Sequence, residues 1–579
     1  MKTHPWIMIC LVMALCAGCT TLPTQGSVHF EPRRSTDIGS GGITIVPESP
    51  PQGASPTMII RGFLTAMASF GSDYATAREY LTHEASASWD PSQSDVLIYA
   101  SGTTPRISGN QVSMSGPVIG MLHRDGSFAG AQEPTWNHDF ALVREDGEWR
   151  ISHPPDGLAL SHYMFTQSYT RIDTYFLSSP GSVLVPDPRY VPRGAWDRTA
   201  ATRLVIHGPS SWLSTIIDPS PRHQVFLDGE VTLNKGIADI PLSPEAQLLD
   251  IDQATALAIE ISASMGDVPG VSRVRLLSEG EVIDVAHSGA DGSIAVSVAQ
   301  DYRPPTMASQ QVLYVESEGS VATLADSQLS VLPGDWNGMP RSISSLAVSR
   351  STSDIAWVGD SGLVTVSGGQ EPQTRLRSDL LLRPHYDSQG HLWAVSLSKG
   401  RAQLHMIGTD AVVDVDSSVL KGMTISGFQV SPDGRRVVFV SGAASPGGKA
   451  QHVLGIALIA YEDDVPTALV SWKPIRLTWQ GAPLSSIIDV AWMGPSSLLV
   501  LGSDSGNPPG LFHTDIDGVG IEEWGYPQPW IPQEMAAVYT DSGPQIMILD
   551  TDHHVWAYQD GYRWSHPVDN VLQCLAFPS

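Results

Sequence analysis

The sequence predicts a multidomain protein in which two N-terminal α+β domains precede an all-β propeller. Three observations support this prediction: the length of 579 residues, a change from helical to strand periodicity along the chain, and a loose repeat in its C-terminal half. Because 42% of the residues are hydrophobic and only 16% are charged, the chain can bury several cores, and a domain takes roughly 100 to 200 residues. We therefore expect a folded chain of two to four domains.

The formal net charge is −27, from 33 Lys+Arg against 60 Asp+Glu. Such a charge repels nucleic-acid phosphates and anionic lipid surfaces. Nucleic acid is therefore not expected as a partner.

The first 18 residues have the order of an export signal. Lys2 precedes an apolar stretch from Trp6 to Ala14, which is too short to span a bilayer. The following Leu-Cys-Ala-Gly-Cys-Thr resembles the bacterial lipobox, although Cys16 stands where an aliphatic residue is usual, and it predicts Cys19 as the lipidated first residue of the mature chain. The alternative is an ordinary secretory signal cleaved nearby.

The chain beyond Cys19 contains no second hydrophobic run of about 18 residues, so the lipid is expected to be the only membrane anchor. Removal of the signal leaves Cys19 for acylation and one further cysteine, Cys574. We therefore expect neither an intrachain disulfide nor a cysteine-based metal site.

Residues 19–55 are polar and rich in Gly, Pro and Ser, which is typical of a tether. An N-terminal α+β domain is expected over residues 56–195. It opens with a helix, because Ser55 and Pro56 form an N-cap and first helical position, and Ile59 and Phe63 begin an apolar face. A second helix near 74–81 and strands at 96–99, 111–115, 118–122, 140–143 and 149–152 are expected to follow.

Residues 184–192 contain three prolines and predict an extended connector. A second α+β domain is expected over residues 196–300. Its helix should begin at Ser243-Pro244 and end near Met265, because Pro269-Gly270 stops it. Strands are expected at 203–207, 223–227, 236–240, 271–277 and 282–285.

A propeller is predicted over residues 301–579. Short strand pairs recur about every 40 to 60 residues, the period of a four-stranded blade. The clearest copy places Ser431-Pro432-Asp433-Gly434 between two apolar strands as a tight turn. Six or more blades are expected, and an array of β-sandwiches is the structural alternative. The repeated passages are 312–324, 345–358, 384–396, 425–440, 487–501 and 546–564.

Several motifs together resemble the actinobacterial LpqB lipoprotein family over nearly the whole chain. The resemblance also covers a middle module called GerMN, at residues 196–300, and the turn at 431–434 is similar to those of TolB-type propeller repeats. The motifs are Arg61 to Met67, Ala77 to Thr82, Trp89-Asp90-Pro91, Leu184 to Pro192, Gly208 to Leu213 and Ile237 to Ile240.

The resemblance implies a palmitate-bearing lipoprotein of the cell membrane, held on the extracytoplasmic face. It also implies a partner, the extracellular domain of the sensor histidine kinase MtrB, and a role in tuning MtrA/MtrB two-component signalling during cell-envelope growth and division. The resemblance assigns no catalytic residues.

Three short motifs allow a chemical interpretation. Gly359-Asp360-Ser361-Gly362 is similar to a protease nucleophile loop, but Asp-Ser-Gly is also ordinary hairpin-turn chemistry, which we favour. Asp515 and Asp517 with Glu522 lack the spacing of a full calcium loop, so a turn is favoured there. His553 and His554 are adjacent, so on a strand they point to opposite faces and would not readily share a metal.

Trp357, Trp393, Trp492 and Trp556 recur beside apolar strand residues. We favour a place in the core over a sugar-binding platform. With no Gly-x-Ser-x-Gly elbow, phosphate loop with its Lys or paired Cys motif, the sequence predicts a binding lipoprotein that is not an enzyme and has neither cofactor nor metal. The alternative is a cell-surface glycan- or peptide-processing propeller hydrolase, which would need two catalytic carboxylates or a nucleophile and base in the propeller funnel.

Overall fold

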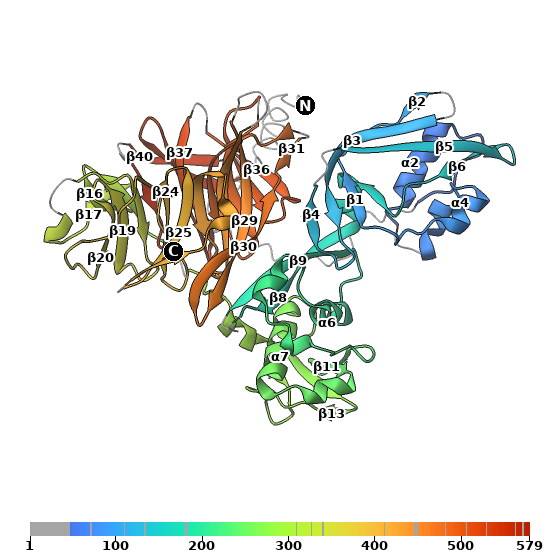
Figure 1. Ribbon diagram of the computed structural model, residues 1–579, viewed down its shortest axis with the longest axis horizontal. Helices are drawn as coiled ribbons and strands as arrows, with labels where there is room; N and C mark the ends of the chain where they lie inside the picture. Colours follow the sequence, from blue (N-terminus) through green and yellow to red (C-terminus); the bar gives the residue numbers. More distant parts are fainter. Residues whose placement is uncertain are drawn as a thin grey trace, which may run out of the picture. The chain divides into compact units, whose positions relative to one another are not determined.

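The computed structural model describes residues 47–579 apart from 70–71, 109–110, 132–134, 180–182, 308–309, 326, 338–340, 410, 445–449, 481, 505, 528–529, 562 and 570–572. The predicted signal, Cys19 and the tether up to residue 46 lie outside the described residues. The described residues form one compact unit. Figure 1 shows this unit as two α+β regions, blue and green, and a strand-rich region from yellow to red.

The predicted first helix is confirmed as α2 (Pro56–Ala66), whose N-cap Ser55 accepts a hydrogen bond from the Met58 amide. The predicted helix near 74–81 is shorter, because Asp73 and Tyr74 have positive φ angles and α3 ends at Arg78. A further helix, α5, follows the strands and was not predicted. The short helices are η1 (Ser72–Tyr74), α3 (Ala75–Arg78), α4 (His83–Ser88) and α5 (His162–Ser168).

A seven-stranded sheet covers these helices, in the order β6-β5-β3-β1-β7 with β2 and β4 also paired to β3. The two strands predicted at 111–115 and 118–122 are one strand, β3, since Gly116 and Pro117 continue the pairing with β5. The strands are β1 (Val96–Tyr99), β2 (Arg106–Ser108), β3 (Gln111–Leu122), β4 (Phe128–Gly130), β5 (Thr135–Glu145), β6 (Glu148–His153) and β7 (Ala159–Ser161).

The predicted connector at 184–192 is extended, but it is the second strand of a hairpin. Strands β8 (Tyr169–Leu177) and β9 (Leu184–Pro192) pair antiparallel over nine residue pairs. The prolines are tolerated because β9 pairs on one side only, so the missing N–H groups of its other side interrupt no ladder. Most of β9 is buried.

The middle region corrects two strand predictions. Residues 203–207 belong to helix α6 (Arg198–His207), which Asp197 caps at the Ala200 amide and which ends at Gly208 with φ 99°. Residues 223–227 follow the helix η3 and contribute only an isolated bridge at Leu227. Helix α6 packs against α7 and Val225 is buried in the same core, so the apolar residues at both places reflect burial rather than membership of a sheet.

The long helix predicted from Ser243 to Met265 is two helices. A 3-10 helix, η4 (Pro244–Leu248), is followed by α7 (Ile251–Ser264), because Asp250 and Gln253 form a capping box that starts a new helix. The other elements are η2 (Leu213–Ile216), η3 (Ser220–Arg222), η5 (Val296–Tyr302), β10 (Thr232–Asn234), β11 (Ile237–Leu242), β12 (Arg273–Ser278), β13 (Glu281–Val282) and β14 (Ile294–Ala295).

The C-terminal region is a propeller of six sheets. The innermost strands of adjacent blades contact one another in a closed ring. The first three blades contain β15 (Leu313–Ser317), β16 (Ser320–Ala325), β17 (Gln328–Val331), β18 (Ser345–Val348), β19 (Asp354–Gly359), β20 (Gly362–Ser367), β21 (Gln373–Leu376), β22 (Leu380–Leu381), β23 (His385–Tyr386), β24 (Leu392–Ser398), β25 (Arg401–Ile407) and β26 (Val412–Val415).

The end of the chain closes the ring. Strand β41 (Leu575–Ala576) pairs with β15 and is the innermost strand of the first blade. The last three blades contain β27 (Thr424–Val430), β28 (Arg436–Ala444), β29 (Ala450–Glu462), β30 (Val465–Ile475), β33 (Ser486–Trp492), β34 (Ser497–Ser503), β35 (Gly510–Asp515), β36 (Ile521–Gly525), β37 (Pro532–Thr540), β38 (Gly543–Asp550), β39 (His554–Asp560) and β40 (Arg563–Asp569), beside the small pair β31 (Thr478–Trp479) and β32 (Ala482–Pro483).

Candidate functional site

The hairpin β8–β9 contacts all three folded regions, so we take it as the first part of the site. Its Tyr190 amide donates to the Gly126 carbonyl of the N-terminal region at 2.7 Å. Its Leu177 amide donates to Glu260 Oε1 of α7 at 2.9 Å. Toward the other end of β8, Arg171 and Asp173 contact Asp515 and Ser496 of the propeller. The hairpin thus joins regions that are far apart in the sequence.

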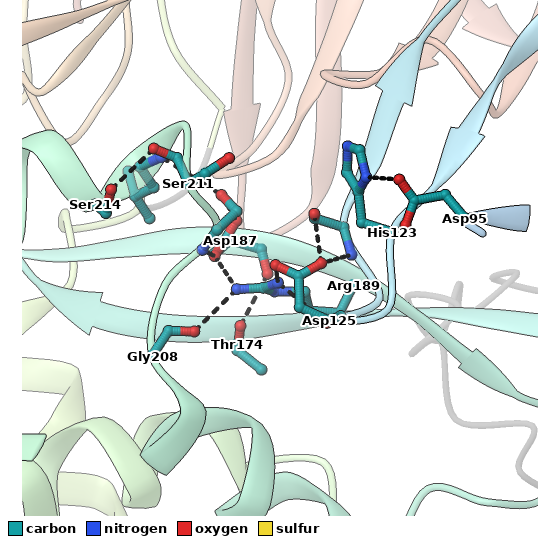
Figure 2. A network of polar contacts seen from close by, with 12 residues as sticks. Asp95, His123, Asp125, Thr174, Asp187, Arg189, Gly208, Ser211 and Ser214 are labelled. Atoms are coloured by element: carbon teal, nitrogen blue, oxygen red, sulfur yellow. Dashed lines mark hydrogen bonds and ion pairs between the residues drawn. The ribbon is translucent and has the colours of Figure 1, made fainter. Parts of the chain in front are cut away.

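A buried polar network surrounds Asp187 and Arg189 of β9 (Figure 2). Arg189 contacts Asp187 Oδ2 and Asp125 Oδ2, each at 2.6 Å, and donates to the Gly208 carbonyl at 3.1 Å. Asp187 also accepts from the amide and the hydroxyl of Ser210, at 2.6 and 2.9 Å. One strand therefore connects the β3–β4 turn with the loop after α6.

The pKa values of the Asp187 and Asp125 carboxyl groups are shifted in opposite directions. Burial raises the pKa of Asp187, although the Arg189 guanidinium and the Ser210 donors act against it. At Asp125, burial is outweighed by Ser127 and Arg189, which hold the pKa of that carboxyl below its usual value. Arg189 therefore compensates a carboxylate that burial would otherwise disfavour.

A second cluster joins β8 to the turn between β35 and β36 of the propeller. Arg171 lies 3.2 Å from Asp173, 3.6 Å from Asp515 and 3.9 Å from Asp517, and the Tyr190 hydroxyl donates to Asp517 at 3.0 Å. Burial and the neighbouring carboxylates raise the pKa of Asp515 to about 7, against the opposing charge of Arg171. The cluster holds more carboxylates than cations.

The loop of residues 208–213, one of the motifs that resemble the LpqB family, makes a third contact between regions. Its Trp212 indole N–H donates to the Ser471 carbonyl of β30. The Lys473 ammonium lies 4.1 Å from the Trp212 ring centroid, close enough for a cation–π interaction. Burial lowers the pKa of Lys473 against the opposing carboxylates of Asp517 and Asp187. This loop therefore attaches the middle region to the fourth blade.

The second part of the site is a cavity of about 300 Å³ on the propeller axis. Inside the ring, Arg383 binds both oxygens of Asp489 at 2.9 and 3.0 Å and Glu534 at 3.0 Å. The two carboxylates raise the pKa of Arg383 although burial opposes them. Beside it, burial lowers the pKa of His385 to about 4, so this imidazole is neutral near pH 7. Asp489 and Glu534 are therefore partners of an arginine rather than a free acid and base.

The structure places the residues singled out in the sequence as follows. Asp360 and Ser361 form the exposed two-residue turn between β19 and β20, as favoured. Asp515 ends strand β35 and Asp517 lies in the turn that follows it, and both carboxylates contact Arg171. His554 contacts Asp550 at 3.3 Å, whereas His553 lies in the turn before β39. Among the described residues, no three His, Cys, Asp or Glu side chains are grouped to hold a metal ion.

The core interpretation of the tryptophans is confirmed for three of the four. Trp357, Trp393 and Trp492 are 3%, 0% and 6% exposed. Trp393 and Trp556 occupy equivalent motifs, each donating its indole N–H to an aspartate six residues earlier, Asp387 at 2.9 Å and Asp550 at 2.8 Å. Trp556 is half-buried and its ring stacks on that of His566 at 4.9 Å.

Sequence reasoning missed the residues that join the regions, above all Asp187, Arg189 and Arg171. One signal was available: in the proline-rich stretch 184–192, Asp187 and Arg189 alternate with the prolines 186 and 188. Charged side chains two residues apart on a strand share a face. That pattern is unusual for a solvated linker.

Fold and site together define a multidomain propeller protein whose two N-terminal α+β regions are fastened to the propeller by a buried hairpin. Two family models match it: the Lipoprotein LpqB N-terminal domain over residues 49–166 and the Lipoprotein LpqB beta-propeller domain over residues 319–573. The chain belongs to the LpqB lipoprotein family.

Relatives named Lipoprotein LpqB include that of Cutibacterium acnes, 27% identical with 96% of both chains covered, and that of Streptomyces coelicolor, 25% identical with 87% of both covered. The crystal structure of TolB from Acinetobacter baumannii covers 61% of this chain and 99% of its own, at 12% identity and a TM-score of 0.31. The relatives' names state no enzymatic activity. Over the described part of the chain, no helix has the length and apolar character needed to cross a membrane.

Proposed function

We propose that this protein is a lipid-anchored, extracytoplasmic accessory protein that binds the extracellular domain of an MtrB-like sensor histidine kinase and modulates its signalling. The observation that carries the proposal is family membership through both the N-terminal and the propeller models. The anchor would be Cys19, with no other hydrophobic run after it.

The packing of the regions supports a binding role. The propeller residue Val519 belongs to the N-terminal core, and Leu458 of β29 belongs to the core of the middle region. Together with the hairpin contacts, this shared packing holds several outer surfaces in one arrangement. A preorganised surface loses less conformational entropy on binding, which favours affinity.

The carboxylates of the channel do not favour the hydrolase alternative. Asp489 and Glu534 are both engaged by Arg383, and Asp489 Oδ2 also accepts from the Met535 amide at 2.9 Å. Using either as an acid or base would require breaking these bonds. Arg383, Asp489 and Glu534 link the inner strands of several blades. We therefore assign these three residues a structural role.

Titration of the purified kinase sensor domain into the protein from Thr20 onward tests the proposal by calorimetry. We expect saturable binding that weakens from low to high salt, because the −27 charge favours a basic partner surface. An unrelated sensor domain is the control. Absence of binding at millimolar concentrations, equivalent to about −4 kcal/mol, would rule out direct kinase contact.

Three charge reversals locate the contact. Glu84→Lys, Asp252→Lys and Asp463→Lys change one exposed acidic residue in the N-terminal, middle and propeller regions, respectively. Loss of affinity in one variant only would assign the kinase to that region. Equal affinity in all three would indicate a mainly apolar contact or one distant from these positions.

A further inference from the structure

The cavity on the propeller axis has an apolar wall and a charged end. Its lining includes Leu184, Met307, Ala536 and Phe577, together with Trp492. Residues of the inner strands of all six blades line it, so it occupies the central channel. Such a pocket lies at the small end of the size range for small-molecule sites.

The segment 303–307 bounds the cavity at the end nearest the hairpin. Its Met307 forms a parallel bridge with Thr540 at the end of β37, and Arg350 donates to the carbonyls of Pro305, at 2.6 Å, and Thr306. Arg303 begins the segment. Arg303 and Arg350, one within the segment and one bonded to it, both line the cavity.

Arg303 and Arg350 form no ion pair with any described residue. Arg303 donates to the Ala263 carbonyl at 3.1 Å and lies over the Tyr175 ring at 4.3 Å, while its buried Nε has no hydrogen-bond partner. The carboxylate that acts on Arg350 is Asp541, which accepts from the Thr306 hydroxyl at 3.2 Å. Two cations are thus not matched by carboxylates at contact distance.

The acidic groups of the same cavity are engaged. Asp387 accepts from the Trp393 indole and from His391, at 2.9 and 3.1 Å. Asp433 binds the Arg436 guanidinium. Arg303 and Arg350 are therefore lining cations without a described carboxylate at contact distance, in a chain whose net charge is −27.

We propose that this cavity binds an organic carboxylate with an apolar body, with the carboxylate at the Arg303 and Arg350 end and the body along the channel wall. A guanidinium matches the geometry of a carboxylate. An inorganic anion would leave the apolar wall uncovered. The proposal is independent of kinase binding.

Calorimetry and tryptophan fluorescence with octanoate, hexanoate and octanol test the proposal on the protein from Thr20 onward. Octanoate has a longer apolar chain than hexanoate, and we expect its affinity to be higher by about four-fold for each added methylene. Octanol, which lacks the charge, should bind at least about ten-fold more weakly. N-acetyl-Leu-Phe with a free carboxylate and the same dipeptide as its amide form a second pair. This pair tests whether the carboxylate that the cavity binds is the C-terminus of a peptide or that of a small organic acid.

Two variants change the charge of the cavity, which both Arg303 and Gln429 line. Arg303→Gln removes one cation, and Gln429→Glu adds a negative charge while keeping an acceptor for the Trp492 amide, now bound at 2.6 Å. Each should weaken octanoate about ten-fold or more. Arg106→Gln, an exposed position on β2, is the control and should change nothing.

The proposal is overturned if octanoate and octanol bind equally, if neither carboxylate binds, or if both variants bind octanoate as the unaltered protein does. Circular dichroism checks that each variant is folded. Gln429→Glu keeps the test decisive if Arg303→Gln disturbs the segment 303–307, because it leaves the hydrogen bonds of that segment intact.

Discussion

Arg189 and Asp187 lie two residues apart on β9, and their side chains meet at 2.6 Å while remaining 1% and 4% exposed. Substitution of Arg189 by Met would leave the Asp187 carboxylate buried without its nearest cation. We expect a loss of about 3 to 5 kcal/mol in unfolding free energy, measured by urea denaturation. The double variant Asp187→Asn with Arg189→Met removes both charges and should recover most of it. Equal stability of Arg189→Met and the unaltered protein would contradict the assignment.

The raised pKa of Asp515 predicts how the stability of the protein depends on pH. Its pKa in the folded protein, about 7, exceeds the usual value, so its ionisation costs stability as the pH rises from about 4 through 7. We expect Asp515→Asn to gain stability relative to the unaltered protein between pH 5 and pH 8, as measured by thermal unfolding.

Comparing Asp515→Asn with the unaltered protein isolates the effect of Asp515, because the other titrating groups are present in both proteins. Glu260, with its pKa raised to about 6 by burial, gives a slope of the same sign. His385, lowered to about 4, gives the opposite slope, because its stability contribution is lost as the pH falls from about 6.5. Asp560→Asn, on the exposed pair with Arg563, is the control. A pH-independent difference for Asp515→Asn would refute the interpretation.

Trp212 should control attachment of the middle region to the fourth blade. Trp212→Ala removes the hydrogen bond to Ser471 and the ring beside Lys473, so we expect a loss of about 2 to 4 kcal/mol. Hydrogen exchange along β30 should increase. Trp212→Phe keeps a ring but not the N–H, and its exchange should be intermediate. Unchanged exchange in Trp212→Ala would show that other contacts suffice.

The C-terminal strand should be required for the propeller. Removal of residues 573–579 deletes β41 and leaves β15 with an unpaired edge, which favours aggregation. Gel filtration and circular dichroism should show aggregated or partly unfolded protein. Removal of Ser579 alone keeps β41 and should give a monodisperse, folded sample. A monodisperse folded product of the longer deletion would mean that the ring tolerates an open blade.

Cys19→Ala should abolish lipid attachment in the native bacterial host, because Cys19 is the predicted acceptor of the lipid. Incorporation of labelled palmitate measures this directly. Cys16→Ala, at the neighbouring cysteine, should keep the label. Label that persists in Cys19→Ala, or is absent from the unaltered protein, would exclude Cys19 as the anchor.

Local signals in the sequence determined individual elements. Ser55 and Pro56 started α2, since an N-cap hydroxyl and a proline at the first position act within one turn. The Asp360-Ser361 turn and the strand at 96–99 were likewise predicted, and the period of the strand pairs indicated a propeller. The signals themselves are local: a cap, a turn and an alternation of side chains are each contained in a few neighbouring residues, although the partners of the strand at 96–99 lie about 20 to 60 residues further along the chain.

The tertiary structure alone decided how the elements join. The proline-rich stretch 184–192 became a strand that fastens three regions, because its side chains contact Asp125 of the N-terminal region, Ser210 of the middle region and Asp517 of the propeller. Residues 203–207 formed a helix rather than a strand, since the same apolar residues pack against α7. Arg171 meets Asp515 over more than 300 positions of sequence. No periodicity encodes such a pair, because contacts at that separation depend on how whole domains pack.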